Sequence, residues 1–343
     1  MRHRNQNTSP HHARVAVLSQ YLEVAERLGF NPVPALRKVG LSKAMLANRE
    51  QKIPIDTAIA LLEESASMSG CEAFGLMMAD ARSISDMGPI SLLLNHQRTL
   101  ADALYTISQY RHLMNESLGL YVESMGRLTL IHEEVISDNN QIGRQAIELA
   151  VGVMCNICRT LTNVHWKPQS INFMHSPPSD LSLHKKILRG TLQFDSDFNG
   201  LTCLTTDMHQ PNPHADPVMA KYAQGFMDSL PKGDDEDLRH EVRKSIYLLL
   251  PMGRASITYV ATSLGISART LQRRLDDSGE SFSDLLSGVR RELSSRYLRN
   301  SSYSMSRIAT QLGYSNQSAF TRWFITDQGT SPTEFRRNME ARK

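Results

Sequence analysis

The sequence lacks any long apolar run and has few cysteines, and both shortages narrow the class of protein. No stretch approaches the roughly 20 apolar residues that a membrane-spanning helix requires. Residues 1–12 are polar and basic with no apolar segment behind them, which is unlike a secretory signal and predicts a loose tail. Four cysteines in 343 residues do not make a disulfide framework. We therefore expect a cytoplasmic protein with reduced thiols and no membrane contact.

Motifs for catalysis and for metal binding are also lacking. The sequence has no Gly-rich phosphate loop, no nucleophile elbow and no helix with two metal-spaced histidines. Cys155 and Cys158 have a metal-like spacing, but no second Cys or His pair lies at a matching distance. We therefore expect no enzyme activity, no metal site and no cofactor.

The net charge of +3 hides an uneven distribution along the chain. Residues 238–343 contain 17 Lys and Arg against 9 Asp and Glu, a net charge of +8. Residues 1–237 contain 21 against 26, a net charge of −5. A basic module beside a mildly acidic one predicts that only the C-terminal part meets a polyanion. The alternative is a solvated basic face without a partner.

Length and composition predict two domains, because 343 residues exceed what one compact core usually holds. Pro231, Gly233 and an acidic run interrupt the apolar periodicity over residues 229–237, which indicates a linker. We expect one domain over residues 13–228 and a second over residues 238–343.

Helical and strand patterns are mixed in residues 13–228, which predicts an α+β fold. Gly126 lies between two alternating segments and indicates a hairpin. A long amphipathic helix follows, with apolar residues at three- and four-residue steps. The expected helices cover residues 15–28, 55–67, 100–115, 142–164 and 181–188, and the expected strands cover 118–124, 127–133, 171–175 and 201–205.

The strongest signal is an internal repeat in the C-terminal domain. Val260–Ser267 matches Ile308–Ser315 at an offset of 48 residues, and after one inserted residue the match continues at an offset of 49. Each copy predicts a short helix that ends at a glycine suited to positive φ, Gly265 or Gly313. The serine that closes each matched segment is a candidate N-cap for a second helix.

A helix, a short turn with glycine and a second helix form the helix-turn-helix, whose second helix enters the major groove of DNA. Arginine bonds guanine bidentately and glutamine bonds adenine, so the first unit favours base reading and the second favours phosphate contacts. Leu271, Leu275, Phe320 and Phe324 lie on the opposite face and are expected in the core. The expected DNA-contacting residues are Ser267, Ala268, Arg269, Gln272 and Arg273 in the first unit, and Asn316, Gln317, Ser318, Thr321 and Arg322 in the second.

One apolar stripe from Phe282 to Tyr297 predicts a helix between the two units. A helix of about 18 residues is about 27 Å long. Such a rod holds two recognition helices about one DNA turn apart, and DNA bending would make up a small shortfall. The C-terminal domain is therefore expected to be all-α, with two helix-turn-helix units joined by a long helix.

The motifs of the C-terminal domain extend beyond the repeat. They include Leu264–Leu275, Ile308–Ala309, Leu312–Ser315, Gly329–Pro332 and Phe335–Arg336. Together they closely resemble the signature of AraC/XylS-type transcriptional regulators over most of residues 238–343. The resemblance implies a bacterial DNA-binding domain of seven helices, usually in an activator that contacts RNA polymerase. Asp327 departs from the family, which often places a bulky or basic residue in that stretch.

The N-terminal domain carries a second set of motifs, which includes Pro34–Leu41, Phe74–Leu76, Phe173–Pro178, Phe194–Ser196 and Asn199–Leu201. They look like the arabinose-binding-type N-terminal domain of regulators grouped with the ornithine-utilisation and virulence activators. They do not resemble the cupin barrel of the arabinose sensor itself. This resemblance implies that the domain senses a small molecule and forms homodimers.

Polar side chains on otherwise apolar surfaces in the middle of this domain are candidates for an effector site. If the effector carries a carboxylate, an arginine is its natural anchor. Each candidate also has the simpler interpretation of a surface residue or a satisfied structural residue. The candidates are Arg111, His112, Tyr121, His132 and Arg144.

The sequence thus predicts a transcriptional regulator, an activator by resemblance, that binds double-stranded promoter DNA. Dimers would bind direct or inverted repeats. One alternative is a ligand-independent architectural DNA binder whose N-terminal domain serves only oligomerisation or partner binding. Another is an enzyme with an attached DNA-binding domain.

Overall fold

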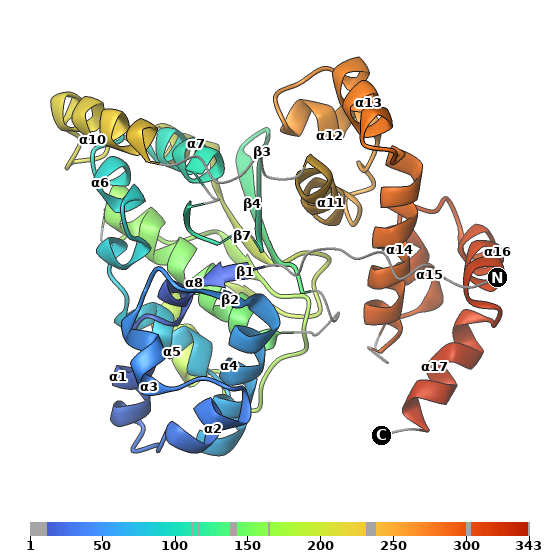
Figure 1. Cartoon of the computed structure of the whole chain (residues 1–343), viewed down its shortest axis with the longest axis horizontal. Coiled ribbons are helices and arrows are strands. Elements are labelled where there is room, and N and C mark those ends of the chain that lie inside the picture. The colour runs from blue at the N-terminus through green and yellow to red at the C-terminus, as the bar shows by residue number, and fades with distance from the viewer. Residues whose placement is uncertain are drawn as a thin grey trace.

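The computed structural model describes residues 12–110, 113–115, 117–137, 143–163, 165–230, 238–299 and 303–341. The expected tail lies outside these residues except for His12, which begins strand β1 (His12–Arg14). Most of the expected linker also lies outside them, and Ser229 ends helix α10 (Pro217–Ser229). Figure 1 shows the N-terminal elements on the left and the C-terminal helices on the right.

The first elements of the N-terminal domain form a helical layer around a small ribbon. β1 pairs antiparallel with β2 (Lys52–Pro54). Helices α4 (Ile55–Ser69) and α5 (Phe74–Ala81) pack against the long helix α8 (Arg144–Leu161). The other helices of this domain are α2 (Val33–Lys38), α3 (Lys43–Ala47), η2 (Ile84–Met87), α6 (Ile90–Leu94), α7 (Leu100–Tyr110), α9 (Ser182–Leu188) and η4 (Thr205–His209).

One expected helix, over residues 15–28, is broken in two, so that prediction was wrong. The chain forms a short 3-10 helix η1 (Val15–Leu18) and then α1 (Tyr21–Arg27). Gln20 between them has a φ of 68°, in the left-handed region that a continuous helix cannot contain. The break lets both Leu18 and Tyr21 reach the core, where they are almost completely buried.

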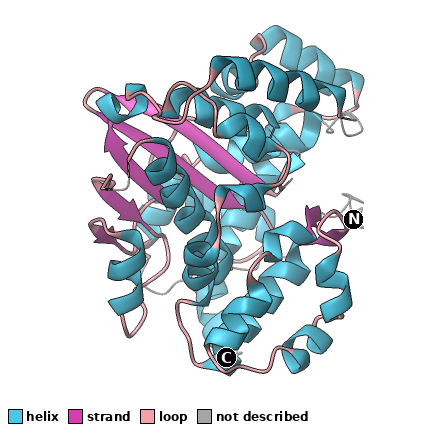
Figure 2. Cartoon of the chain, turned by 90° about the vertical axis from the view of Figure 1, so that its left-hand side faces the viewer, coloured by secondary structure: helices cyan, strands magenta, loops and turns pink. Residues whose placement is uncertain are grey.

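A five-stranded mixed sheet stands at the centre of the chain. The hairpin predicted at Gly126 joins the first two strands, and this glycine has a φ of 67°. The strand order is β3-β4-β7-β5-β6, antiparallel except for the β5–β6 pair. Figure 2 shows these strands in magenta, and the small β1–β2 ribbon, also magenta, lies away from them near the N-terminus. Their bounds are β3 (Leu118–Met125), β4 (Leu128–Val135), β5 (Ser170–Asn172), β6 (Leu192–Gln193) and β7 (Gly200–Leu204).

Each face of this sheet is covered by a helix from a different domain. Helix α8 packs against one face, where Ile131 and Cys155 belong to the same buried cluster. Helix α11 (Leu238–Leu249), the first of the C-terminal domain, packs against β3 and β4 on the other face. A side chain at Gly119 would lie 3.1 Å from Leu248, so the glycine permits this close approach. The middle strand β4 is consequently buried on both sides.

The C-terminal domain contains only helices among its described residues, as the sequence predicts. The apolar faces of the two repeat units meet in one core, in which Leu271, Leu275, Phe320 and Phe324 are fully buried. The α+β and all-α classes predicted for the two parts are therefore confirmed. Among the described helices, none is both long and apolar enough to cross a bilayer. The helices after α11 are α12 (Ile257–Ser263), α13 (Ala268–Asp277), α14 (Phe282–Leu298), α15 (Met305–Gln311), α16 (Gln317–Gln328) and α17 (Pro332–Glu340).

Candidate nucleic-acid interface

The first helix-turn-helix unit consists of α12, a glycine turn and α13. Gly265 has a φ of 69°, as a residue that ends a helix in the left-handed region must. Ser267 then caps α13, because its Oγ accepts the backbone N–H of Thr270 at 3.1 Å. Val260 and Ala261 of α12 are buried beneath the turn. The predicted glycine and N-cap roles are both confirmed in this unit.

The second unit, α15 and α16, repeats this geometry with one difference. Gly313 also has a φ of 69°. The N-cap of α16 is Asn316, whose Oδ1 accepts the backbone N–H of Ala319 at 2.9 Å. Ser315 was the expected cap, so that detail was wrong. The residue inserted at this point of the repeat moves the cap one position along, so that Ser267 corresponds to Asn316.

Helix α13 presents its long polar side chains to solvent. Arg269, Gln272 and Arg273 are exposed, and the two arginines make no ion pair with any described residue. Gln272 Nε2 donates to Asp276 Oδ1 at 2.9 Å, one helical turn away. Ala268 is half-buried. Helix α13 therefore offers the guanidinium groups of Arg269 and Arg273, which have no ion-pair partner among the described residues, and an amide held by Asp276.

Helix α16 presents a less charged surface. Gln317, Ser318 and Arg322 are exposed, and Thr321 is half-buried. The Asn316 side chain is already committed to the helix cap. Among the proposed contacts of α16, only Arg322 carries charge, against two such residues on α13.

Helix α14 joins the two units as the rod predicted between them. Its 17 residues correspond to about 26 Å. Arg290 on this rod donates through Nε to the backbone carbonyl of Leu312 at 3.0 Å. Its guanidinium also lies 4.5 Å from the centre of the Tyr314 ring. The rod therefore holds the turn of the second unit through a side chain that the sequence analysis did not single out.

The unusual residue Asp327 has a defined role in this arrangement. It lies near the end of α16 and accepts hydrogen bonds from Arg291 of α14, with 2.8 Å between Arg291 Nε and Asp327 Oδ2. A bidentate arginine–carboxylate pair is geometrically specific. Asp327 thus fixes the recognition helix of the second unit against the rod.

The first contact region between the domains lies along β3 and β4. Glu134 of β4 pairs with Arg296 of α14, and Glu123 of β3 pairs with Arg254 in the α11–α12 connection. Asn199 Nδ2 donates to the second oxygen of Glu134 at 3.0 Å. Both oxygens of this buried carboxylate are therefore satisfied, one by each domain.

A second contact region joins the N-terminal domain to helix α15. Asp197 Oδ1 lies 3.1 Å from Arg307 Nε and 2.7 Å from Gln311 Nε2. Nearby, the Tyr303 hydroxyl donates to the backbone carbonyl of Met174 at 2.8 Å. The sequence analysis missed these residues, although two of the N-terminal motifs, Phe194–Ser196 and Asn199–Leu201, flank Asp197. The rod α14, the connection that precedes α12 and helix α15 of the second unit are thus anchored to the same sheet and its loops.

The structure brings together only two of the predicted effector residues. Arg111 and His112 lie outside the described residues. Tyr121 and His132 are direct cross-strand partners on β3 and β4, on the face that meets the C-terminal domain. His132 is buried, and this burial lowers its pKa to about 4. Its ring therefore stays neutral at physiological pH.

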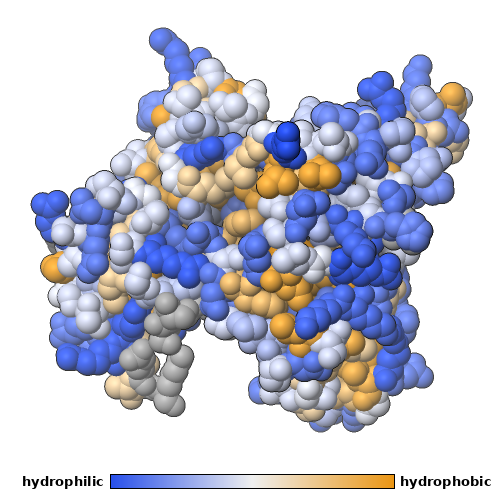
Figure 3. All heavy atoms as spheres, turned by 180° about the vertical axis from the view of Figure 1, so that it is seen from behind, coloured by the Kyte–Doolittle hydropathy of each residue, from blue (hydrophilic) through white to orange (hydrophobic). Residues whose placement is uncertain are grey.

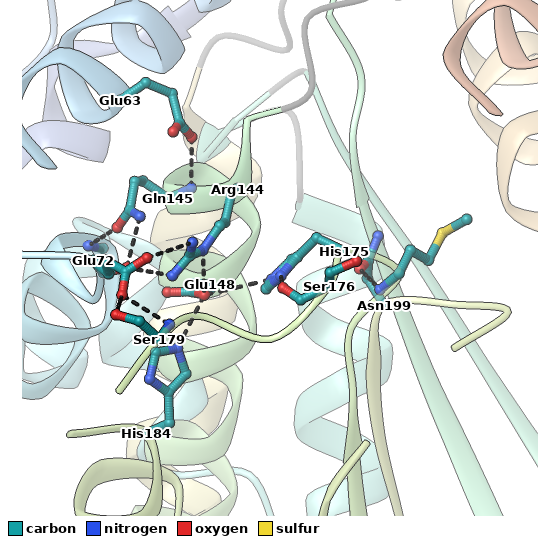
Figure 4. Close-up of polar contacts among 12 residues, drawn as sticks. Glu63, Glu72, Arg144, Gln145, Glu148, His175, Ser176, Ser179, His184 and Asn199 are labelled. Atoms are coloured by element: carbon teal, nitrogen blue, oxygen red, sulfur yellow. Dashed lines mark hydrogen bonds and ion pairs between the residues drawn. The ribbon is translucent and has the colours of Figure 1, made fainter. Parts of the chain in front are cut away.

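Arg144, the remaining candidate, lies on the other side of the sheet at the start of α8. Its Nε lies 3.1 Å from Glu148 Oε1, and its Nη1 lies 3.6 Å from Glu72 Oε1. His184 Nε2 lies 3.0 Å from the same oxygen of Glu148. Figure 4 shows Arg144 and His184 pointing toward Glu148, with Glu72 on the other side of Arg144. An effector carboxylate at Arg144 would compete with two carboxylates that already hold it.

The two cysteines with metal-like spacing are buried in the core. Cys155 and Cys158 both lie on the inner face of α8, and burial raises the pKa of the Cys155 thiol to about 12. A metal binds the thiolate, which this burial disfavours. The described residues contain no group of three or more His, Cys, Asp or Glu side chains that could hold a metal ion.

Comparison with known proteins identifies the family. A family model described as the arabinose-binding domain of AraC transcription regulator, N-terminal, matches residues 29–212, more than half of the chain. The chain belongs to the AraC family of transcription regulators. A helix-turn-helix domain model matches residues 260–338, which contain both repeat units of this AraC-type domain.

Relatives of this AraC-family chain match most of its length. The HTH-type transcriptional regulator VirS of Mycobacterium tuberculosis is 27% identical over 329 residues, 94% of this chain and 96% of VirS. The ornithine utilization regulator of Pseudomonas aeruginosa is 23% identical over 283 residues, 80% of this chain and 82% of that protein. The crystal structure of the transcriptional regulator CdpR from P. aeruginosa aligns with this chain at a TM-score of 0.42 and 18% sequence identity. The alignment covers 92% of this chain and 98% of CdpR. These families and relatives are transcriptional regulators and not enzymes.

Proposed function

We propose that this chain is a sequence-specific regulator that inserts α13 and α16 into successive major grooves of promoter DNA. The observation that carries the proposal is the pair of capped recognition helices on one rod, whose exposed arginines have no ion-pair partner within the described part of the chain. Because α14 is shorter than one DNA turn of about 34 Å, we expect the DNA to bend toward the protein. The deformability of the operator then adds to its recognition.

The two units divide the work of recognition. Arg269, Gln272 and Arg273 give the first unit the side chains that read guanine and adenine edges. The second unit contributes Gln317, Ser318, Thr321 and Arg322 and relies more on phosphate contacts. Three residues at the starts of the recognition helices set how closely the backbone approaches the DNA. They are the N-caps Ser267 and Asn316 and the half-buried Ala268.

Single substitutions on α13 test this assignment. Arg273→Ala and Gln272→Ala should each weaken operator binding by about 1 to 3 kcal/mol and relax the base preference at one position, because each removes a base-edge contact. Arg274→Ala is the matched control, since it removes the same charge from the next residue of the helix. Binding-site selection with each variant measures the preference. Equal, uniform weakening by Arg273→Ala and Arg274→Ala would contradict base reading by Arg273.

Specificity itself is measured by comparing operator DNA with random DNA at physiological salt. A regulator of this kind should prefer its operator by more than about 10³-fold. A smaller ratio would instead favour an architectural DNA binder.

The proposal includes a homodimer formed through the N-terminal domain. Helix α10 supports it with an apolar stripe that faces solvent, in which Tyr222 is 72% and Phe226 is 46% exposed. The opposite side of the helix, at Ala223 and Met227, is buried. At the upper right of Figure 3, where α10 lies when the molecule is seen from behind, apolar side chains reach the surface. The stripe consists of Val218, Met219, Tyr222 and Phe226.

Sedimentation velocity tests the α10 surface. Tyr222→Glu should shift the protein to monomer, because a charge in an apolar interface is costly to bury. Lys221→Glu is the control, a charge change at the neighbouring exposed residue. Unchanged dimerisation in Tyr222→Glu would exclude this helix as the interface.

We further propose that the regulator acts in the cytoplasm, responds to a small molecule and activates transcription by contacting RNA polymerase. The match to an arabinose-binding-type domain supports the sensing role. A ligand that binds only the folded protein raises its apparent stability by mass action. A thermal-shift screen of metabolites followed by transcription in vitro with RNA polymerase tests both parts. Transcription that is unchanged by the protein and by every stabilising metabolite would contradict them.

A further inference from the structure

A cavity lies on the side of β4 that faces away from the DNA-binding domain. Its volume is about 140 Å³, it is partly open to solvent, and it is lined mainly by α8, α4 and residues 14–17 and 82–87, with the strands β3 and β4 on one side. The walls are mainly aliphatic, with Ile59, Leu62, Leu149 and Val153 among them, and none of the described residues that line it is aromatic. An engineered apolar cavity of about 150 Å³ holds one benzene molecule. The space therefore suits a flexible aliphatic molecule of about six or seven non-hydrogen atoms.

One polar group in this cavity has no described partner. Glu133 of β4 lines the cavity and is only 1% exposed. Among the described residues, no hydrogen bond or ion pair reaches its carboxyl group, and its Oε2 is buried without a partner. Burial raises the pKa of this carboxyl to about 8. A buried carboxyl without a partner is costly, which makes it a candidate binding group.

The other charged groups that line the cavity already have partners. Arg14 Nη1 lies 2.8 Å from Glu50 Oε2, and Asp86 Oδ1 lies 3.3 Å from Arg49 Nη1. Arg82 donates through its guanidinium to backbone carbonyls of η1 and the residue that follows it. Arg14 Nε is itself buried without a partner, but each of these three side chains has at least one partner. Among the described residues that line the cavity, Glu133 is therefore the charged group with no partner at all.

We propose that this cavity binds a small aliphatic molecule with one basic nitrogen, whose ammonium group pairs with Glu133. The aliphatic walls take the hydrocarbon part, and the carboxylate takes the charge in a setting of low dielectric. This inference rests on the proposed function, because it gives the chemical class of the effector that the regulator senses.

The position of the site explains how occupancy reaches the DNA-binding domain. Successive side chains of a strand point to opposite faces. Glu133 therefore faces the cavity, while its neighbours His132 and Glu134 face the C-terminal domain, where Glu134 pairs with Arg296. A ligand that binds Glu133 acts on the same strand that anchors α14. A ligand that binds one arrangement of β4 more tightly than another favours that arrangement. The difference between the two binding free energies can therefore strengthen or weaken the contact of β4 with α14.

Proton balance makes a distinctive prediction. The ligand nitrogen keeps its proton below pH 9, whereas the neutral Glu133 carboxyl releases one proton to solvent when the ammonium group binds. Amine affinity should therefore rise with pH by about tenfold per unit below the carboxyl pKa and level off above it. Glu133 interacts electrostatically with the thiols of Cys155 and Cys158 on α8, but burial raises the pKa of Cys155 to about 12 and that of Cys158 well above its ordinary value, so neither titrates in this range. Burial lowers the pKa of Arg82 only to about 10, and hydrogen bonds from Ser83 and Gln20, which outweigh burial, lower the pKa of Asp86. Both groups therefore keep their charge between pH 6 and pH 8.

Calorimetric titration of the full-length protein without DNA tests the proposal. The probes are hexylamine, hexanol and hexanoate, which share one chain length and differ in the polar group. Hexylamine should bind at pH 8 at least about tenfold more tightly than the other two, with release of about half a proton per site at pH 8 and nearly one at pH 6. Glu133→Gln should abolish the preference for the amine and leave hexanol binding unchanged, since the cavity keeps its shape. Glu26→Gln, an exposed residue of the same domain, is the control.

Two results would overturn the inference. One is tighter binding of hexanoate than of hexylamine, which would make the cavity arginines the anchor. The other is equal binding of all three probes in wild type and Glu133→Gln, which would leave an apolar void without a charged site. Operator affinity of the same preparations is measured separately. Absence of amine binding would then leave DNA recognition untouched, and absence of specific operator binding would leave the amine site untouched.

Discussion

Replacing Glu133 by Gln should raise the stability of the folded protein progressively as the pH increases. The folded carboxyl has a pKa of about 8, against about 4.5 for an unburied glutamate, because burial disfavours its charge. Between these values the folded state keeps a proton that the unfolded state has lost, so wild-type stability falls as pH rises. At about 1.4 kcal/mol per pH unit, the advantage of Glu133→Gln should grow by about 4 kcal/mol between pH 4 and pH 8.

Urea unfolding of both proteins across this pH range, followed by circular dichroism and tryptophan fluorescence, measures that difference. His132 titrates with the opposite sign, because its lowered pKa makes stability fall as pH decreases from about 6.5 toward 4. Its contribution is common to both proteins and cancels in their difference. The exposed variant Glu26→Gln should show no such trend. A stability difference between Glu133→Gln and wild type that does not vary with pH would refute the buried, neutral carboxyl.

Three further substitutions test the architecture. Phe320→Ala removes a fully buried side chain from the C-terminal core and should lower the free energy of unfolding by about 3 to 5 kcal/mol in urea. Ser267→Ala removes the cap of α13 and should cost about 1 kcal/mol, seen as a lower melting temperature. Glu134→Gln should weaken the contact with Arg296 and speed amide hydrogen exchange in β4 and α14. If a variant gives the same value as wild type in its measurement, the contact removed by that substitution does not contribute as described.

The C-terminal domain could be predicted in detail because its signals are local. The glycines and caps of each unit depend on a few neighbouring residues, and the repeat provided each signal twice. The apolar stripe of α14 likewise appears in the sequence at helical spacing. The cap of α16 was misplaced by one residue because Ser315 and Asn316 are both good N-caps, and only the helix geometry decides between them.

The N-terminal domain was harder to predict because its decisive features are not local. Glu133 ended an expected strand, and nothing in the sequence indicated its burial, since a polar His-Glu-Glu run rarely lies inside a core. The strand in fact continues to Val135 and is covered on one face by α8 and on the other by the C-terminal domain. Helix α10 was not predicted. Its exposed apolar stripe could not be inferred either, because apolar residues at helical spacing usually indicate a buried face. Pattern alone does not tell which helices cover which face.

Guanine methylation protection on the operator, located by footprinting DNA around the chain's own coding sequence, tests the central claim most directly. Two protected clusters should lie about one helical turn, or about 10 base pairs, apart on one face of the duplex for each protein chain. Arg273→Ala should remove protection from one cluster and Arg322→Ala should weaken the other. A single protected cluster, or protection that survives both substitutions unchanged, would contradict recognition by two helices on one rod.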